Sequence, residues 1–385
     1  MNILDYIKIN SNSKFSKQPF NEIDAAIFAQ LCYLRFEDIN KNILIKDISK
    51  IDNYKEIMLR GRDSYPQDEE LLDLIIKSKR FKDVEILDSV FDFDVQKEMQ
   101  FAATIFKISF DKIVIAYRGT DGTVVGWKEN LNMIYMPQTN GQIAAKDYLE
   151  KIARRYPTKR FVLTGHSKGG NIATYAATFS NNKAKNQIKR VYNFDGPGFR
   201  AYFYKTTQYK NISNKIFKFV PQTAIFGRLF RSGDFEVIKS NNTLAWQHLI
   251  YSWIVSGNKF VRLEDTDMIS DNFWNAGKQF MDSFDYEERK EFVDALYLIL
   301  TASDCYYIDD IVKNKDSLFA SIEAYIKTDR SKKEMMIELV KSLISDIISS
   351  GVSEIKKSIS KKIEKIKSQT MKDNSINKNN QKVKQ

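Results

Sequence analysis

The sequence has few of the residues that cross-link or interrupt a chain. Its 385 residues include only two cysteines, six prolines and 15 glycines. Cys32 and Cys305 lie far apart, which excludes a disulfide framework and a CxxC metal site and favours buried thiols in a reducing compartment. The shortage of proline and glycine favours long regular elements.

Long hydrophobic runs are also missing. The chain has no apolar stretch of the roughly 18 residues that a membrane-spanning helix needs. The first residues, MNILDYIKINSNSKF, lack an apolar core and a small-residue cleavage site, so we expect no secretory signal peptide. We therefore expect a protein that is cytoplasmic, or that is secreted by a route independent of a signal peptide.

Charge is unbalanced toward the basic side. The 60 lysines and arginines exceed the 49 acidic residues and give a net charge of +11. Such a balance favours anionic partners without choosing between nucleic acid and lipid. Zinc-finger spacing and basic motifs interleaved with aromatic residues are absent, so nucleic acid is not the expected partner.

Apolar and amphipathic segments alternate along the first three hundred residues. Where strands alternate with helices, from 112 to 220, the pattern predicts a parallel sheet covered on both faces. Asn21 is the expected N-cap of the first long helix. Helices are expected at 21–36, 67–79, 141–155, 169–180 and 272–301, and strands at 83–89, 97–108, 112–117, 159–164, 189–194 and 215–220.

The C-terminal part differs in character. Residues 331–368 carry a narrow apolar stripe followed by many lysines, which predicts a long amphipathic basic helix. That helix either lies on an anionic membrane surface or packs on the body or on a helical protein partner. We expect a catalytic domain at 1–310, a helical extension at 311–370 and a disordered Asn/Lys-rich tail at 371–385.

The chemistry centres on the segment Gly165-His166-Ser167-Lys168-Gly169-Gly170. It follows the apolar strand FVLT and precedes the helix NIATYAATF, which is the context that a G-x-S-x-G nucleophile elbow requires. The serine would stand at the positive end of a helix, where an alkoxide and an oxyanion are stabilised. Ser167 is the expected nucleophile and the Lys168 backbone N–H an expected oxyanion-hole donor; the alternative is a turn whose serine is only a helix cap.

A serine nucleophile needs a base, and the chain has two histidines. His166 adjoins the serine inside the elbow and is expected to point away from its hydroxyl. His248 is therefore the expected base; it follows the last expected strand, which fits a Ser-Asp-His chain order.

The acid and the second oxyanion donor are less constrained. Asp195 ends the strand after the nucleophile helix and is the expected acid, while Asp234 is the alternative because it lies closer in sequence to His248. Either aspartate also fits a simple turn or a surface loop. Thr120, in Arg118-Gly119-Thr120 after the strand IVIAY, is the expected second donor or else part of a plain turn.

RGT after one strand and GHSKGG after the next resemble class 3 lipases. The ordered set of segments that starts with FNEIDA at residue 20 and LCYL at residue 31 more closely resembles the Mbeg1-like family, a domain of unknown function related to those lipases. It continues with YRGTDGT, GHSKGG, NFDGPGF, KFVPQTAIFG and QHLIYSW, and the resemblance covers about residues 20 to 310. The resemblance implies an α/β-hydrolase fold with a mostly parallel central sheet, here with a C-terminal helical extension. It further implies hydrolysis of lipid or acyl esters by Ser167, His248 and an aspartate, with no metal or cofactor.

One departure from the lipase pattern matters. Class 3 lipases carry their acid near a Val-Pro after the penultimate strand, whereas Val220-Pro221-Gln222-Thr223-Ala224 holds no carboxylate. Either Asp195 or Asp234 replaces it, or the triad is incomplete.

Three functional hypotheses follow. The first is a serine esterase of the lipase, phospholipase A or lysophospholipase type. The second is an exported antibacterial lipase toxin whose C-terminal helices bind a target or a partner. The third is a non-catalytic scaffold that keeps the hydrolase fold.

Overall fold

A computed structural model describes residues 1–59, 66–230, 233–302 and 305–307. The helical extension expected at 311–370, the basic helix at 331–368 within it and the tail at 371–385 lie outside these residues. Among the helices that are described, none is long and apolar enough to cross a membrane.

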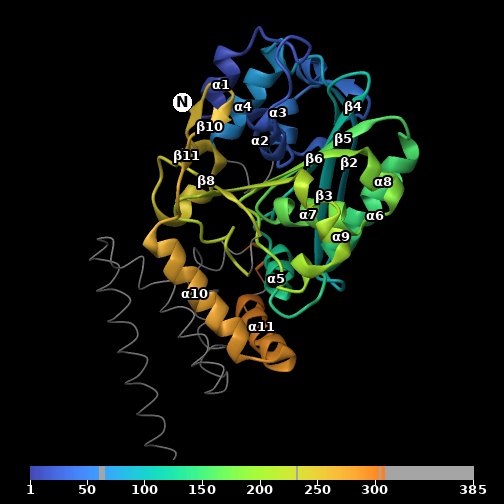
Figure 1. Cartoon of the computed structure of the whole chain (residues 1–385). Helices are drawn as coiled ribbons and strands as arrows, with labels where there is room; N and C mark the ends of the chain where they lie inside the picture. Colours follow the sequence, from blue (N-terminus) through green and yellow to red (C-terminus); the bar gives the residue numbers. More distant parts are fainter. Residues whose placement is uncertain (60–65, 231–232, 303–304, 308–385) are drawn as a thin grey trace, which may run out of the picture. The chain divides into compact units, whose positions relative to one another are not determined.

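The centre of the fold is a mixed nine-stranded sheet in the order β1-β2-β3-β4-β5-β6-β7-β8-β11 (Figure 1). Strands β4 to β8 run parallel, and antiparallel strands flank them on both sides. This is the α/β-hydrolase fold that the sequence predicts. The strands are β1 (Ile43–Leu44), β2 (Glu85–Asp94), β3 (Met99–Lys107), β4 (Lys112–Tyr117), β5 (Arg160–His166), β6 (Ile188–Phe194), β7 (Ile216–Pro221), β8 (Glu236–Ile238) and β11 (Arg262–Leu263).

Helices cover both faces of the sheet because its central strands bury side chains on both sides. One core contains Val162 of β5 and the apolar faces of α1 (Ile3–Ile9), α2 (Glu22–Leu31) and α4 (Pro66–Lys77). The other contains Leu163 of β5 with α6 (Asn140–Arg155), α7 (Lys168–Phe179) and α8 (Asn182–Gln187). In Figure 1 the first group is blue and the second green.

Local signals start the main helices where the sequence places them. Asn21 caps α2 in a reciprocal capping box with Asp24, and Thr139 caps α6 in the same way with Gln142. The helix expected at 21–36 ends earlier, at Leu31, and a short 3-10 turn at Phe36–Asp38 follows.

The helix expected at 272–301 is two helices, α10 (Met268–Ser283) and α11 (Tyr286–Thr301). Phe284 between them is extended, and the Asp285 carboxylate accepts the backbone N–H of Glu288 to start the second helix. The capping signal competes with the apolar periodicity there, and a single helix was the wrong prediction.

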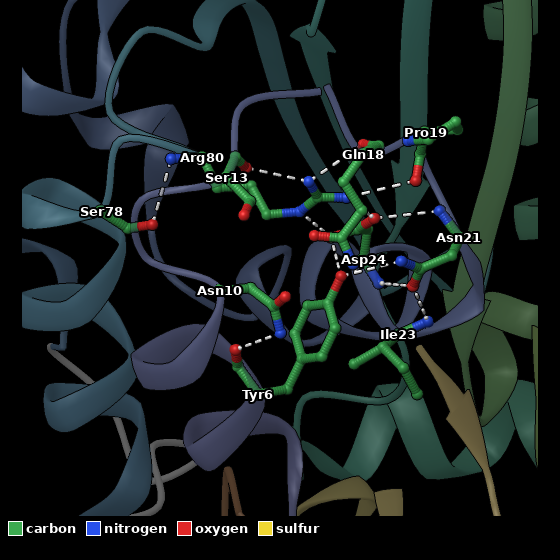
Figure 2. Close-up of polar contacts among 10 residues, drawn as sticks. All are labelled: Tyr6, Asn10, Ser13, Gln18, Pro19, Asn21, Ile23, Asp24, Ser78 and Arg80. Atoms are coloured by element: carbon green, nitrogen blue, oxygen red, sulfur yellow. Dashed lines mark hydrogen bonds and ion pairs between the residues drawn. The ribbon is translucent and has the colours of Figure 1, made fainter. Parts of the chain in front are cut away.

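A buried ion pair fastens α2 and the loop before it to the turn that follows α4. Arg80 binds both carboxylate oxygens of Asp24, with Nη2 2.6 Å from Oδ2, and both side chains are fully buried. Its remaining N–H groups donate to backbone carbonyls of the loop before α2, including that of Ser13 at 3.0 Å. Figure 2 shows the guanidinium surrounded by these acceptors.

Candidate active site

Ser167 occupies a sharp turn between β5 and α7. Its φ of 56° and ψ of −132° are unfavourable for a residue with a side chain, so surrounding contacts must impose them. The turn packs tightly: a Cβ on Gly165 would lie 2.2 Å from the carbonyl carbon of Gly169, and one on Gly169 would lie 2.1 Å from the carbonyl oxygen of Tyr117. Glycines on either side of the serine therefore let α7 start directly against the sheet.

The structure brings His248 and Asp195 together. Nδ1 of His248 lies 2.6 Å from Oδ2 of Asp195, a carboxylate that is fully buried at the end of β6. The other oxygen, Oδ1, accepts the backbone N–H of Gly227 at 3.0 Å. A Cβ at Gly227 would lie 2.1 Å from that oxygen, so only glycine lets this loop close on the acid.

Two aromatic rings pack against the His248 imidazole. Its centroid is 4.4 Å from that of His166 and 4.4 Å from that of Phe226. Among the residues described, Nε2 of His248 has no partner, and the Ser167 hydroxyl makes no hydrogen bond to it. Contacts between a nucleophile and its base commonly tighten only when substrate binds.

Burial sets the protonation of this pair. It lowers the pKa of His248 to about 3, so the imidazole is neutral and able to accept a proton at neutral pH. Burial also raises the pKa of Asp195 to about 7, while the nearby Lys218 acts in the opposite direction.

Thr120 and Lys168 lie on the loop after β4 and at the first position of α7. The backbone N–H groups of both residues lack an acceptor in the part of the chain that the structure describes. The Thr120 hydroxyl is fixed by Asn130, whose Nδ2 donates to it at 2.6 Å. Two free N–H groups, one at the positive end of a helix, suit a developing oxyanion.

Asp234 lies elsewhere. It is exposed and lines a cavity of about 170 Å³ together with Tyr209 and Lys218. The hydrogen bond to His248 comes from Asp195. In the place where lipases carry their acid, Thr223 accepts a hydrogen bond from Nε2 of Gln247 at 2.9 Å and so holds the neighbour of His248.

The sequence did not predict two structural features that contribute to this site. The first is helix α5 (Val124–Asn132), which carries Asn130 and was not expected as a helix. The second is the side chain of Lys168, which is buried and paired with Glu129 of α5 at 2.8 Å. The sequence does place a lysine directly after the nucleophile, but whether its side chain points into the protein depends on packing that the sequence does not show. Within the described ranges, no cluster of three or more His, Cys, Asp or Glu could hold a metal ion.

A sequence model of the Mbeg1-like family matches residues 75–298, which is more than half of the chain. A search of curated proteins gave no match. Among solved structures, the chain is similar to a Rhizomucor miehei lipase–propeptide complex, with 13% identity and a TM-score of 0.35 over 57% of this chain and 68% of that one. It is also similar to Lip2 lipase from Yarrowia lipolytica, with 13% identity and a TM-score of 0.34 over 56% and 76% of the two chains.

Proposed function

We propose that this chain, which belongs to the Mbeg1-like family, is a serine hydrolase that cleaves carboxylic esters of lipids. The observation that carries the proposal is the 2.6 Å contact between His248 and Asp195 beside a serine in a strained strand-to-helix turn. A neutral imidazole that is oriented by a buried carboxylate is what a serine nucleophile needs as its base.

The proposed reaction uses the chain's own residues throughout. Oγ of Ser167 attacks the ester carbonyl as Nε2 of His248 removes its proton, and Asp195 stabilises the resulting imidazolium. The backbone N–H groups of Thr120 and Lys168 donate to the oxyanion of the tetrahedral intermediate. His248 then gives its proton to the departing alcohol, and a water activated in the same way hydrolyses the acyl-enzyme and restores Ser167.

A lipid ester is the proposed substrate class for two reasons. The segments RGT and GHSKGG resemble class 3 lipases in sequence. Two apolar side chains lie near the base: Phe226 packs on the His248 ring in space, and Trp246, two residues before His248 in the chain, is 66% exposed. An acyl chain favours such surroundings over water. A lipase, phospholipase A or lysophospholipase is therefore the proposed type.

The scaffold hypothesis rested on the missing carboxylate after Val220-Pro221. Asp195 reaches His248 from the end of β6, which is adjacent to the strand β7 that ends at Pro221. The missing carboxylate after Val220-Pro221 therefore no longer favours a non-catalytic protein. The toxin hypothesis and membrane binding through 331–368 depend on residues outside the described ranges, and both stay predictions.

A fluorescent fluorophosphonate tests the proposal directly. We expect it to label the purified protein covalently and to leave the Ser167→Ala variant unlabelled, because only an activated serine attacks the probe. Hydrolysis of a panel of triacylglycerols, phospholipids and lysophospholipids then identifies the ester. A folded wild-type protein that is neither labelled nor active, with and without anionic vesicles, would refute the proposed activity.

A further inference from the structure

The side chain of Lys168 turns away from solvent into the protein. It is 1% exposed, and its Nζ contacts three acceptors: the carbonyl oxygen of Gln100 at 2.6 Å, Oε1 of Gln100 at 2.5 Å and Oε2 of Glu129 at 2.8 Å. An ammonium group has three N–H donors, so each has an acceptor. The residue whose backbone N–H faces the proposed oxyanion is thus anchored through its own side chain.

The Glu129 carboxylate, which pairs with Lys168, also accepts hydrogen bonds from the backbone. It is fully buried, and its Oε2 also accepts the backbone N–H of Gln100 at 3.1 Å. Its Oε1 accepts the backbone N–H of Gly141, in the first turn of α6, at 2.6 Å. A Cβ on Gly141 would lie 2.3 Å from that oxygen, so the approach depends on glycine. One carboxylate therefore joins α5 to α7, β3 and α6.

The residue after Glu129 contacts the other half of the proposed oxyanion hole. Nδ2 of Asn130 donates to Oγ1 of Thr120 at 2.6 Å. Consecutive residues of α5 thus hold the two segments that supply backbone N–H groups, Glu129 through the Lys168 side chain and Asn130 through Thr120. Catalysis by such donors depends on their being fixed before the charge develops.

We propose that the buried Lys168–Glu129 ion pair sets the relative position of the two oxyanion donors, which makes both side chains positioning residues. The inference rests on the hydrolase activity proposed above. Stability alone does not require charges at these two positions, because replacing a buried ion pair with apolar residues of similar volume is often neutral or stabilising. The charges instead define one geometry for α7 against α5.

The test compares the double variant Lys168→Met/Glu129→Gln with the single variant Lys128→Met. Lys128 is a matched control: it adjoins Glu129 on α5, is equally buried at 1% exposure, and pairs with Asp294 of α11 at 2.7 Å instead of with α7. We expect the double variant to stay folded with a lower thermal midpoint, because the backbone N–H groups of Gln100 and Gly141 lose a carboxylate acceptor. Its KM should stay within about threefold, while kcat for a p-nitrophenyl ester falls by about 10- to 100-fold. Lys128→Met should keep kcat within about threefold.

Each result has one consequence. If the double variant keeps kcat, or if Lys128→Met loses as much, the inference is wrong and the proposed activity stands. If the wild-type protein is inert toward both the ester and a fluorophosphonate, the proposed activity fails and the inference fails with it. Should the double variant not fold, Glu129→Asp keeps the charge and shortens its reach; kcat must then fall at unchanged KM, and an unchanged kcat overturns the inference.

Discussion

Nε2 of His166 lies 2.7 Å from the backbone carbonyl oxygen of His248, and the two imidazole rings pack with their centroids 4.4 Å apart. A carbonyl oxygen only accepts, so Nε2 of His166 carries the proton and donates it. Nδ1 of His166 is then an acceptor and receives the Tyr33 hydroxyl at 3.1 Å. Burial lowers the pKa of His166 to about 3, so this neutral form persists at working pH. The histidine beside the nucleophile therefore supports the proposed base.

Replacing His166 by Phe should separate ring packing from hydrogen bonding. The phenyl ring keeps the packing on His248 but removes the N–H that holds its carbonyl, so we expect kcat to fall by about tenfold as the base loses its alignment. Tyr33→Phe is the control, since it leaves the His166 donor in place and should cost less. Ester hydrolysis rates with thermal midpoints measure both variants; an unchanged kcat in His166→Phe would show that the carbonyl contact has no catalytic effect.

Asp195→Asn should lower kcat by about 10³- to 10⁴-fold, because an amide neither fixes the required His248 tautomer nor stabilises the imidazolium. Asp234→Asn makes the same chemical change at an exposed position and should stay within about twofold of the wild type. Initial rates on one ester, together with the rate of fluorophosphonate labelling, measure both. The reverse order of effects would transfer the proposed acid role to Asp234.

Much of this site follows from local signals in the sequence. The strand before Ser167, the helix after it and the flanking glycines are adjacent in the chain, and the presence of only two histidines limits the choice of base. Asp195 could be ranked first because it ends the strand after the nucleophile helix. Its contact with His248, however, depends on Gly227, 32 residues further along, which no local pattern reveals.

Other features depend on long-range packing and could not be predicted. Helix α5 is short and weakly amphipathic, and its start depends on Thr123, whose hydroxyl accepts the Gly126 N–H. The burial of Lys168 contradicts the usual exposure of lysine, and it requires a carboxylate 39 residues away. Residues far apart in sequence create these contacts, so only the folded chain shows them.

Arg80→Met should destabilise the fold by about 3–5 kcal/mol, because it leaves the Asp24 carboxylate buried without its partner. The backbone carbonyls around the guanidinium in Figure 2 would lose their donors as well. The double variant Asp24→Asn/Arg80→Met should recover part of the loss. Urea unfolding measures these changes. Lys8→Met, which breaks an ion pair that is exposed on both sides, should change little; an equally small effect of Arg80→Met would contradict the expectation.

The acidic limb of the pH–rate profile should report Asp195. Its pKa is raised to about 7 by burial, and its ionised form is the one that stabilises the imidazolium. As pH falls through about 7, Asp195 gains a proton and kcat/KM should decline. Lys218 is the nearby cation: its buried Nζ donates to the carbonyl oxygen of Gly227 at 2.5 Å, and the Gly227 N–H donates to Asp195.

Lys218→Met should therefore move that limb to higher pH. A positive charge near Asp195 favours the carboxylate, so its removal raises the pKa of Asp195 and leaves less of the active form at neutral pH. Burial lowers the pKa of Lys218 to about 7, so the charge is only partly present at neutral pH and the shift should be moderate. Lys215→Met removes a charge three residues earlier, where Nζ donates to the Ile188 carbonyl, and should leave the limb in place. Profiles of kcat/KM from pH 5 to 9 distinguish the two, and coincident limbs in all three proteins would mean that Lys218 has no electrostatic effect on the proposed acid.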